Sequence, residues 1–406
     1  MDRLALGREI CPVEPTSSFL IVLLLAGCAG LLVLVVRLNH WAIRVVCGAS
    51  VVVLAMLTGA AEVNDHYGYY TSWAPLVDDL AGSQQALGLT SGTVRVGRHE
   101  LRAGTVEQVA LPGRLSTINR LGLIYLPPQY NDPKFSHVRF PVVELLHGSP
   151  GKPSNWVVVL KIVKIADVLI SRHLMGPVVL VMPSVNRGND FEECVNGRAA
   201  ADDTYLATDV PTDVRTRFRV SLVPAEWGVA GYSSGGYCAA NLSLRHRGAY
   251  GAAAILDGYY RASDGPAAHA LGGDPRAMAA NSPVDIAQHL PAGTEPLPAL
   301  WITAGTGAHG DYLRAEEFIA ALKNLEQVSF VVEHGAGHNF YAWSAALPSM
   351  LAWMWQQLAP PALRTSFPLT GPPISVQVPP LVPPRSTRTG RSAQPRAVRA
   401  RPGVQR

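Results

Sequence analysis

One glycine-flanked serine constrains the fold of this chain more than any other feature. The segment Gly231-Tyr232-Ser233-Ser234-Gly235-Gly236 follows the apolar run Trp227–Ala230 and precedes a helical stretch. Glycine two positions before and two positions after a serine permits a strand-to-helix turn so tight that the serine backbone is strained. Ser233 meets both conditions, whereas Ser234 has a tyrosine two positions before it. The segment therefore predicts a nucleophile elbow that exposes the Ser233 hydroxyl as a candidate nucleophile.

The rest of residues 93–358 alternates short β-rich runs with helical stretches. The expected strands are Leu121–Leu126, Val142–Leu146, Val178–Met182, Trp227–Ala230, Ala253–Leu256, Leu300–Ala304 and Val328–Glu333. The expected helices are Trp156–Ile170, Gly236–Arg245, Tyr312–Asn324 and Ala345–Leu358. Such alternation indicates a mostly parallel sheet with helices on both faces. Together with the elbow, it predicts an α/β-hydrolase fold with a mostly parallel, doubly wound sheet.

Two uncharged apolar stretches, 19–36 and 45–61, lie near the N-terminus. A membrane-spanning helix needs roughly 20 apolar residues, with about 17 as the lower limit, so both stretches qualify. The chain as a whole is 48% hydrophobic and only 16% charged, which is too apolar for a purely soluble protein. We therefore expect a two-helix transmembrane hairpin that follows an N-terminal segment, 1–18.

The charges around this hairpin predict its orientation. Arg37 and Arg44 lie between the two stretches, whereas no Lys or Arg follows the second stretch before Arg95. Positively charged loops tend to stay in the cytoplasm. The sequence therefore predicts a multi-pass plasma-membrane protein with both chain ends and the catalytic domain outside the cytoplasm. A cleaved signal peptide, or a lipoprotein anchored at Cys28, is the alternative.

Two further segments flank the catalytic domain. Residues 62–92 are expected to form a juxtamembrane linker, and 359–406 a disordered tail. The tail contains eleven Pro and eight Arg, and it has too few apolar residues to offset its chain entropy. The net charge of +4 comes from this tail, so the composition does not indicate a nucleic-acid-binding protein.

A second glycine cluster, His147-Gly148-Ser149-Pro150-Gly151, follows the expected strand Val142–Leu146. In a fold with a nucleophile elbow, the loop after that strand supplies one backbone N–H of the oxyanion hole, and the residue after the nucleophile supplies the other. The candidate donors are the N–H groups of Ser149 and Ser234. His147 itself is expected to be a structural residue of the turn.

The general base and the acid are expected late in the chain, after the last two strands. His338 stands in a loop of small residues that directly follows Val328–Glu333. Asp311 is the one carboxylate in the loop after Leu300–Ala304, and the order Ser, Asp, His is the one that this fold uses. Asp311 is also a plausible helix cap, so Glu316 and Glu317 remain alternative acids.

The cysteines predict neither a metal site nor a cofactor site. The five cysteines form no CxxC pair and no Cys/His cluster at zinc spacing. Cys194 and Cys238 are the two in the expected catalytic domain. Outside the cytoplasm they are candidates for a disulfide, and two unpaired thiols are the equally weighted alternative.

At these motifs the sequence resembles the esterase D / antigen 85 branch of α/β-hydrolases, which includes enterochelin-esterase-like proteins and mycolyltransferases. The resembling features lie between about 93 and 358. They are Leu121–Leu126 with Pro127-Pro128-Gln129-Tyr130, then Leu145-Leu146-His147-Gly148, the elbow, and Gly337-His338-Asn339 with Trp343. The resemblance implies a Ser/acid/His triad and an acyl-enzyme. It also implies that the acyl group can pass to a sugar as well as to water.

The chain departs from the mycolyltransferases at two places. It has His147-Gly148 in the oxyanion loop, and it offers Glu316 and Glu317 near the position of their glutamate acid. The expected partners are an ester or acyl-sugar substrate and membrane lipid, and the oligomeric state is not predicted. The alternative from a different class is a catalytically silent envelope-binding domain that keeps the fold.

Overall fold

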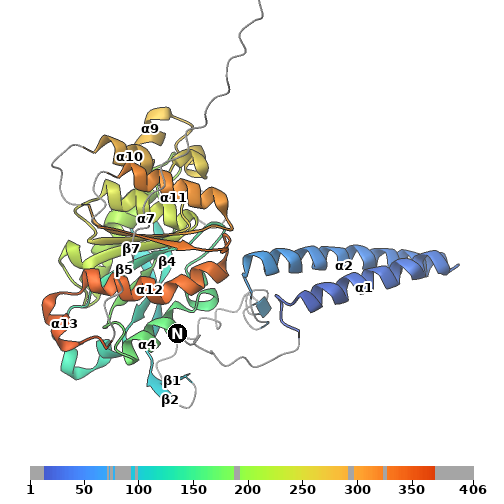
Figure 1. The fold of residues 1–406 in the computed structure, drawn as a ribbon, viewed down its shortest axis with the longest axis horizontal. Helices are drawn as coiled ribbons and strands as arrows, with labels where there is room; N and C mark the ends of the chain where they lie inside the picture. Colours follow the sequence, from blue (N-terminus) through green and yellow to red (C-terminus); the bar gives the residue numbers. More distant parts are fainter. Residues whose placement is uncertain are drawn as a thin grey trace, which may run out of the picture.

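The computed structural model describes residues 13–70, 73, 76–77, 93–96, 99–186, 193–290, 297–322 and 327–370. Figure 1 shows an α/β domain and a long helical hairpin that projects from one side of it. The hairpin consists of α1 (Ser18–Arg37) and α2 (Trp41–Tyr67). Both helices are long and apolar enough to cross a membrane, and few of their residues are buried within the structure.

The central sheet has eight strands in the order β10-β9-β8-β7-β5-β6-β4-β3. Its strands are β3 (Thr105–Pro112), β4 (Asn119–Leu126), β5 (Val142–Leu146), β6 (Val179–Met182), β7 (Trp227–Tyr232), β8 (Ala252–Leu256), β9 (Ala299–Gly305) and β10 (Val328–Glu333). Strands β5 to β10 are parallel, whereas β4 runs antiparallel to both β6 and β3. The predicted fold class, a mostly parallel α/β-hydrolase sheet, is confirmed. A separate antiparallel pair is formed by β1 (Thr93–Val96) and β2 (His99–Arg102).

Helices cover both faces of the sheet, and each face has its own apolar core (Figure 1). In β5, Val142 and Leu146 belong to one core, and Val143 and Leu145 belong to the other. This alternation follows from the two-residue period of a strand. The longer helices are α4 (Ile162–Ser171), α6 (Val210–Arg217), α7 (Ser234–Arg245), α11 (His309–Ala321) and α12 (Phe340–Leu358). The shorter ones are α5 (Asp202–Thr204), α8 (Ala267–Ala270), α9 (Pro275–Ala280), α10 (Pro283–His289) and α13 (Pro361–Ser366).

Two expected helices have different bounds in the structure. The expected helix Trp156–Ile170 is a π-helical turn, η4 (Asn155–Val159), followed by α4. The two are separated at Lys161, which adopts a left-handed conformation with φ of 54°. Helix α12 begins at Phe340, five residues before the expected start, because the Asn339 side chain caps it by accepting a hydrogen bond from the Ala342 N–H.

The two segments that flank the catalytic domain also differ from expectation. Helix α2 continues to Tyr67 and ends at Gly68, whose φ of 70° suits a C-terminal glycine, so the expected linker 62–92 begins as helix. The tail is ordered at its start, because α13 buries Leu363 and Phe367 packs against Phe135. The rest of the linker, apart from 73 and 76–77, and residues 371–406 of the tail lie outside the described residues, as do residues 1–12.

Candidate active site

Ser233 lies at the sharp turn between β7 and α7. Its backbone has φ of 56° and ψ of −124°, a strained conformation for a residue with a side chain. A Cβ atom on Gly231 would lie 2.0 Å from the carbonyl oxygen of Gly235, and a Cβ atom on Gly235 would lie 2.2 Å from that of Leu146. Only glycine fits at these two positions, which explains the spacing of the motif around Ser233.

Three side chains from the carboxyl ends of different strands form a hydrogen-bonded chain. The Nε2 atom of His338 lies 2.9 Å from Ser233 Oγ, and its Nδ1 atom lies 2.7 Å from Asp311 Oδ2. Ser233 follows β7, Asp311 lies in the first turn of α11 after β9, and His338 lies between β10 and α12. A neutral His338 with its proton on Nδ1 donates to Asp311 and accepts from the Ser233 hydroxyl.

The two alternative acids contact other groups. Glu316 accepts a hydrogen bond from the Tyr312 hydroxyl at 2.6 Å, and Glu317 pairs with Arg261 at 2.5 Å. The structure therefore brings Asp311, and neither glutamate, into contact with His338.

A second buried carboxylate, Asp257, lies behind the histidine and was not anticipated from the sequence. It follows β8 directly, accepts a hydrogen bond from the Trp343 Nε1–H at 2.8 Å, and accepts another from the Gly305 N–H at 3.0 Å. Trp343 in turn packs edge-on against the ring of His338, with ring centroids 5.1 Å apart. Asp257 directly follows a core strand, at the same end of the sheet as Ser233. This position is the one signal in the sequence that could have identified it.

Burial perturbs the carboxylic acids around this histidine. It raises the pKa of Asp257 to about 6, an effect that hydrogen bonds from Gly305 and Trp343 and the charge of His338 partly oppose. Burial also raises the pKa of Glu333, at the end of β10, to about 7. Carboxylic acids with perturbed pKa values that lie close together are typical of functional sites.

The glycine-rich loop after β5 passes beside the elbow. A Cβ atom on Gly148 would lie 3.1 Å from the Cβ of Ser233, so this loop contacts the nucleophile side of the turn. His147 is buried, and burial lowers its pKa to about 4. The neutral ring bonds the Gly148 carbonyl through Nδ1 and accepts from the Val185 N–H through Nε2. His147 is thus a structural residue of this loop, as its place in the turn predicted.

Ser149 follows Gly148 in the loop that contacts the elbow, and Ser234 directly follows the nucleophile. Ser234 is the first residue of α7, where the N–H groups have no partner within the helix. Neither N–H group bonds to an acceptor in the part of the chain that the structure describes. The two donors predicted from the sequence therefore lie next to the elbow and are unpaired among the described residues.

A disulfide joins Cys194 to Cys238, with their Cα atoms 5.5 Å apart. Cys238 lies on α7, five residues after the nucleophile. The neighbouring Glu193 accepts hydrogen bonds from the Tyr259 hydroxyl and the Ala267 N–H, and burial raises its pKa to about 8. These contacts tie the loop before α5 to the elbow helix and to the segment after β8. Within the described ranges, no three His, Cys, Asp or Glu side chains are arranged to hold a metal ion.

Comparison with known proteins gives the family of this chain. The sequence matches the model of the Esterase family over residues 118–354, more than half of its length. An uncharacterized protein of Corynebacterium glutamicum is 26% identical over 331 residues, which cover 75% of each of the two chains.

Several solved structures share the fold. A ferulic acid esterase has a TM-score of 0.56 at 20% identity, covering 63% of this chain and 99% of its own. An S-formylglutathione hydrolase from Agrobacterium tumefaciens has a TM-score of 0.53 at 17% identity, covering 66% and 100%. The fluorophosphonate-binding serine hydrolase F of Staphylococcus aureus has a TM-score of 0.53 at 17% identity, covering 62% and 99%. At these identities the likeness shows the fold alone, but with the family match it confirms the prediction of an esterase-type α/β-hydrolase. The chain therefore belongs to the Esterase family.

Proposed function

We propose that this protein is a membrane-anchored serine esterase or acyltransferase that acts on ester substrates of the cell envelope through an acyl-enzyme on Ser233. The observation that carries the proposal is the continuous hydrogen-bonded chain from Ser233 through His338 to Asp311. A domain that only bound its ligand would gain nothing from a strained serine held 2.9 Å from an imidazole nitrogen.

The first half of the reaction forms the acyl-enzyme. Ser233 Oγ attacks the ester carbonyl carbon while His338 Nε2 takes the hydroxyl proton, and Asp311 stabilises the imidazolium that results. The tetrahedral intermediate then expels the alcohol, which leaves with the proton from His338. In the second half, His338 takes a proton from water or a sugar hydroxyl, that oxygen attacks the acyl carbon, and Ser233 is regenerated.

The backbone N–H groups of Ser149 and Ser234 donate hydrogen bonds to the negatively charged oxygen of both tetrahedral intermediates. Ser234 directly follows the nucleophile and Ser149 lies in the loop that contacts the elbow. Neither N–H group has an acceptor among the described residues, which supports this role. Loss of one donor of this kind typically costs about 3 kcal/mol of transition-state stabilisation. Because the donors belong to the backbone, side-chain substitution at either residue does not remove them.

Contacts between the hairpin and the domain support an active site that faces the membrane. Tyr69, directly after α2, packs edge-on against Phe340 with ring centroids 5.0 Å apart. Phe340 lies 5.4 Å from Tyr232, the residue before the nucleophile. The carboxyl ends of the parallel strands, where Ser233 lies, are thus the end of the sheet nearest to the hairpin (Figure 1). An enzyme anchored in this way would receive ester substrates at or near the membrane surface.

Hydrolysis of a soluble short-chain ester tests the proposed catalytic roles. Replacement of Ser233 or His338 by alanine should abolish turnover, whereas Ser171→Ala should retain the wild-type rate. Ser171 is an exposed serine on α4 whose hydroxyl bonds only its own helix, and it provides a matched control. Turnover by Ser233→Ala at more than about one hundredth of the wild-type rate would contradict the proposal. The ratio of hydrolysis to transfer, measured with a sugar acceptor present, separates the esterase from the acyltransferase.

Cysteine labelling in intact cells tests the proposed topology. In a chain whose Cys11, Cys28 and Cys47 are replaced by alanine, His40→Cys should react with a membrane-impermeant maleimide only after lysis. A cysteine introduced at the exposed Ser263 should react in intact cells. Labelling of His40→Cys from outside would contradict the proposed orientation.

A further inference from the structure

The segment that follows the hairpin is held in place by one side chain. Asn64, in the last turn of α2, accepts a hydrogen bond from the Tyr70 N–H at 2.8 Å and donates one to the Tyr70 carbonyl at 2.9 Å. It also donates to the carbonyl of Pro15, just before α1, at 3.2 Å. The chain turns at Gly68, the residue that ends α2. Tyr69 is therefore fixed between Gly68 and Tyr70, at the end of the hairpin nearest to the domain (Figure 1).

Tyr69 packs against the first residue of α12. Its ring meets that of Phe340 edge-on, with centroids 5.0 Å apart, and it packs against the apolar core on this face of the sheet. The preceding residue adds a second contact, because a Cβ atom on Gly68 would lie 2.7 Å from the ring of Tyr341. Phe340 and Tyr341 follow His338 closely in the chain. The hairpin thus contacts the domain directly beside the histidine loop.

Phe340 connects this contact to the aromatic side chains of the active site. It is buried, and its ring centroid lies 5.4 Å from that of Tyr232 and 5.0 Å from that of Trp343. Trp343 stacks on Tyr232 at 4.6 Å and meets the ring of His338 edge-on at 5.1 Å. A close-packed interior transmits displacements, because it has few voids to absorb them. A shift of Phe340 should therefore reach both Trp343 and His338.

The loop that carries His338 has little packing of its own. Residues 335–337 are glycine or alanine, and none of the residues from 333 to 339 is buried. The histidine ring is held by its hydrogen bonds to Ser233 and Asp311 and by the aromatic contact with Trp343. The orientation of His338 therefore depends on how firmly the start of α12 is fixed.

We propose that Tyr69 is a positioning residue that holds His338 in place through Phe340 and Trp343, so that the hairpin is part of the catalytic unit as well as its anchor. This inference rests on the proposed function, because the reaction in question is acyl transfer at Ser233. His338 Nε2 lies 2.9 Å from Ser233 Oγ, within the range that proton transfer requires. Misplacement of a reacting group by about 1 Å, caused by a distant substitution, can lower a rate by about 10²-fold.

Kinetics of the full-length chain in neutral detergent, with a soluble short-chain ester, test this role. Tyr69→Ala should lower kcat by about 10- to 100-fold and change KM by less than about threefold, because the proton acceptor is misplaced. Tyr69→Phe keeps the ring and should retain kcat within about twofold. Trp41→Ala is the control, because this exposed ring lies at the other end of α2, about 40 Å along the helix, and kcat should not change.

Asn64→Ala provides a second perturbation that changes no residue in contact with the domain. It removes the hydrogen bonds to Tyr70 and Pro15 and should lower kcat in the same direction as Tyr69→Ala. This variant decides the test if Tyr69→Ala fails to fold. Equal kcat in Tyr69→Ala and Trp41→Ala, or a loss in Tyr69→Phe as large as in Tyr69→Ala, would overturn the inference.

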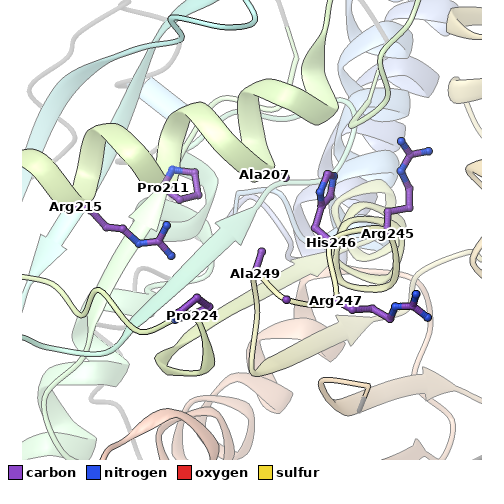
Figure 2. A pocket seen from close by; sticks show the side chains of 9 residues that line it. Ala207, Pro211, Arg215, Pro224, Arg245, His246, Arg247 and Ala249 are labelled. Carbon is purple, nitrogen blue, oxygen red and sulfur yellow. The ribbon is translucent and has the colours of Figure 1, made fainter. Parts of the chain in front are cut away.

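Hydrogen exchange distinguishes failure of this inference from failure of the proposed function. Tyr69→Ala should speed amide exchange in the peptide 338–347 and leave the peptide 245–249 unchanged. The latter lies at the end of the sheet opposite to Ser233, where its residues line a cavity of about 500 Å³ (Figure 2). Faster exchange in both peptides, or in neither, would overturn the inference. A wild type that hydrolyses no ester would contradict the proposed function, and exchange alone would then decide whether Tyr69 holds the histidine loop.

Discussion

Replacement of Asp311 by asparagine should separate the three candidate acids of the triad. In the structure, Asp311 Oδ2 lies 2.7 Å from His338 Nδ1, and Oδ1 lies 3.1 Å from Arg314 Nη1. An asparagine amide fits this space but can donate to Nδ1, which would shift the His338 proton to Nε2. That nitrogen faces Ser233 Oγ at 2.9 Å and could then no longer accept the serine proton.

The size of the effect follows from these contacts. A hydrogen bond to a charged group contributes about 1.5–3 kcal/mol, which alone corresponds to a loss of roughly 10- to 150-fold. Inversion of the tautomer in a Ser-His-Asp triad lowers kcat by about 10⁴. The charge of Asp257 acts on His338 as well and remains in the variant. We therefore expect kcat/KM to fall by about 10² to 10⁴, mainly through kcat.

Steady-state kinetics with a soluble ester measures this loss. Glu316→Gln and Glu317→Gln are the matched controls, because each replaces a carboxylate of α11 that contacts Tyr312 or Arg261 and not His338. Both should retain kcat/KM within about threefold. A loss below tenfold in Asp311→Asn, together with a large loss in either glutamate variant, would refute the assignment of the acid.

Three further results are expected. Asp257→Asn should lower kcat/KM by about tenfold and remove an inflection near pH 6 from the acid limb of its pH profile. The reason is that protonation of Asp257, as the pH falls through its pKa of about 6, removes a charge that stabilises the His338 imidazolium. An unchanged profile would contradict this. In denaturant unfolding, the difference in unfolding free energy between Glu144→Gln and wild type should grow in favour of the variant by about 3–5 kcal/mol as the pH is raised from about 5 to about 9. The reason is that burial raises the pKa of Glu144 from 4.5 to about 8, so its contribution to stability falls as the pH rises through this window; a constant difference would contradict it. Replacement of both Cys194 and Cys238 by serine should cost about 4 kcal/mol of unfolding free energy, because their disulfide closes a loop with a sequence separation of 44; a loss below 1 kcal/mol would contradict this.

The sequence was most informative where the chemistry allows a single residue type. Gly231 and Gly235 lie against backbone atoms that leave no room for a Cβ, so the motif around Ser233 predicted the turn. The parallel core strands were equally clear, because β5 to β8 are buried along their whole length and their sequences are almost wholly apolar. His338 was identifiable because small residues precede it in the loop after β10.

Features that depend on tertiary contacts were harder to predict. Strand β3 lies at the edge of the sheet and has exposed Glu107 and Gln108, so its pattern was too weak to indicate a strand. Asp257 acquires its importance from Trp343, which lies 86 positions later in the sequence. The interruption of the expected helix at Lys161 has no local signal in the sequence, because lysine rarely adopts positive φ.

Covalent labelling of the full-length protein with a fluorophosphonate probe, mapped by peptide mass spectrometry, tests the central claim most directly. A serine whose hydroxyl is activated by an imidazole should carry a single adduct at Ser233. Labelling should be lost in Ser233→Ala and strongly slowed in His338→Ala. An unlabelled Ser233, or an adduct on Ser149 or Ser234 in its place, would contradict the proposed nucleophile.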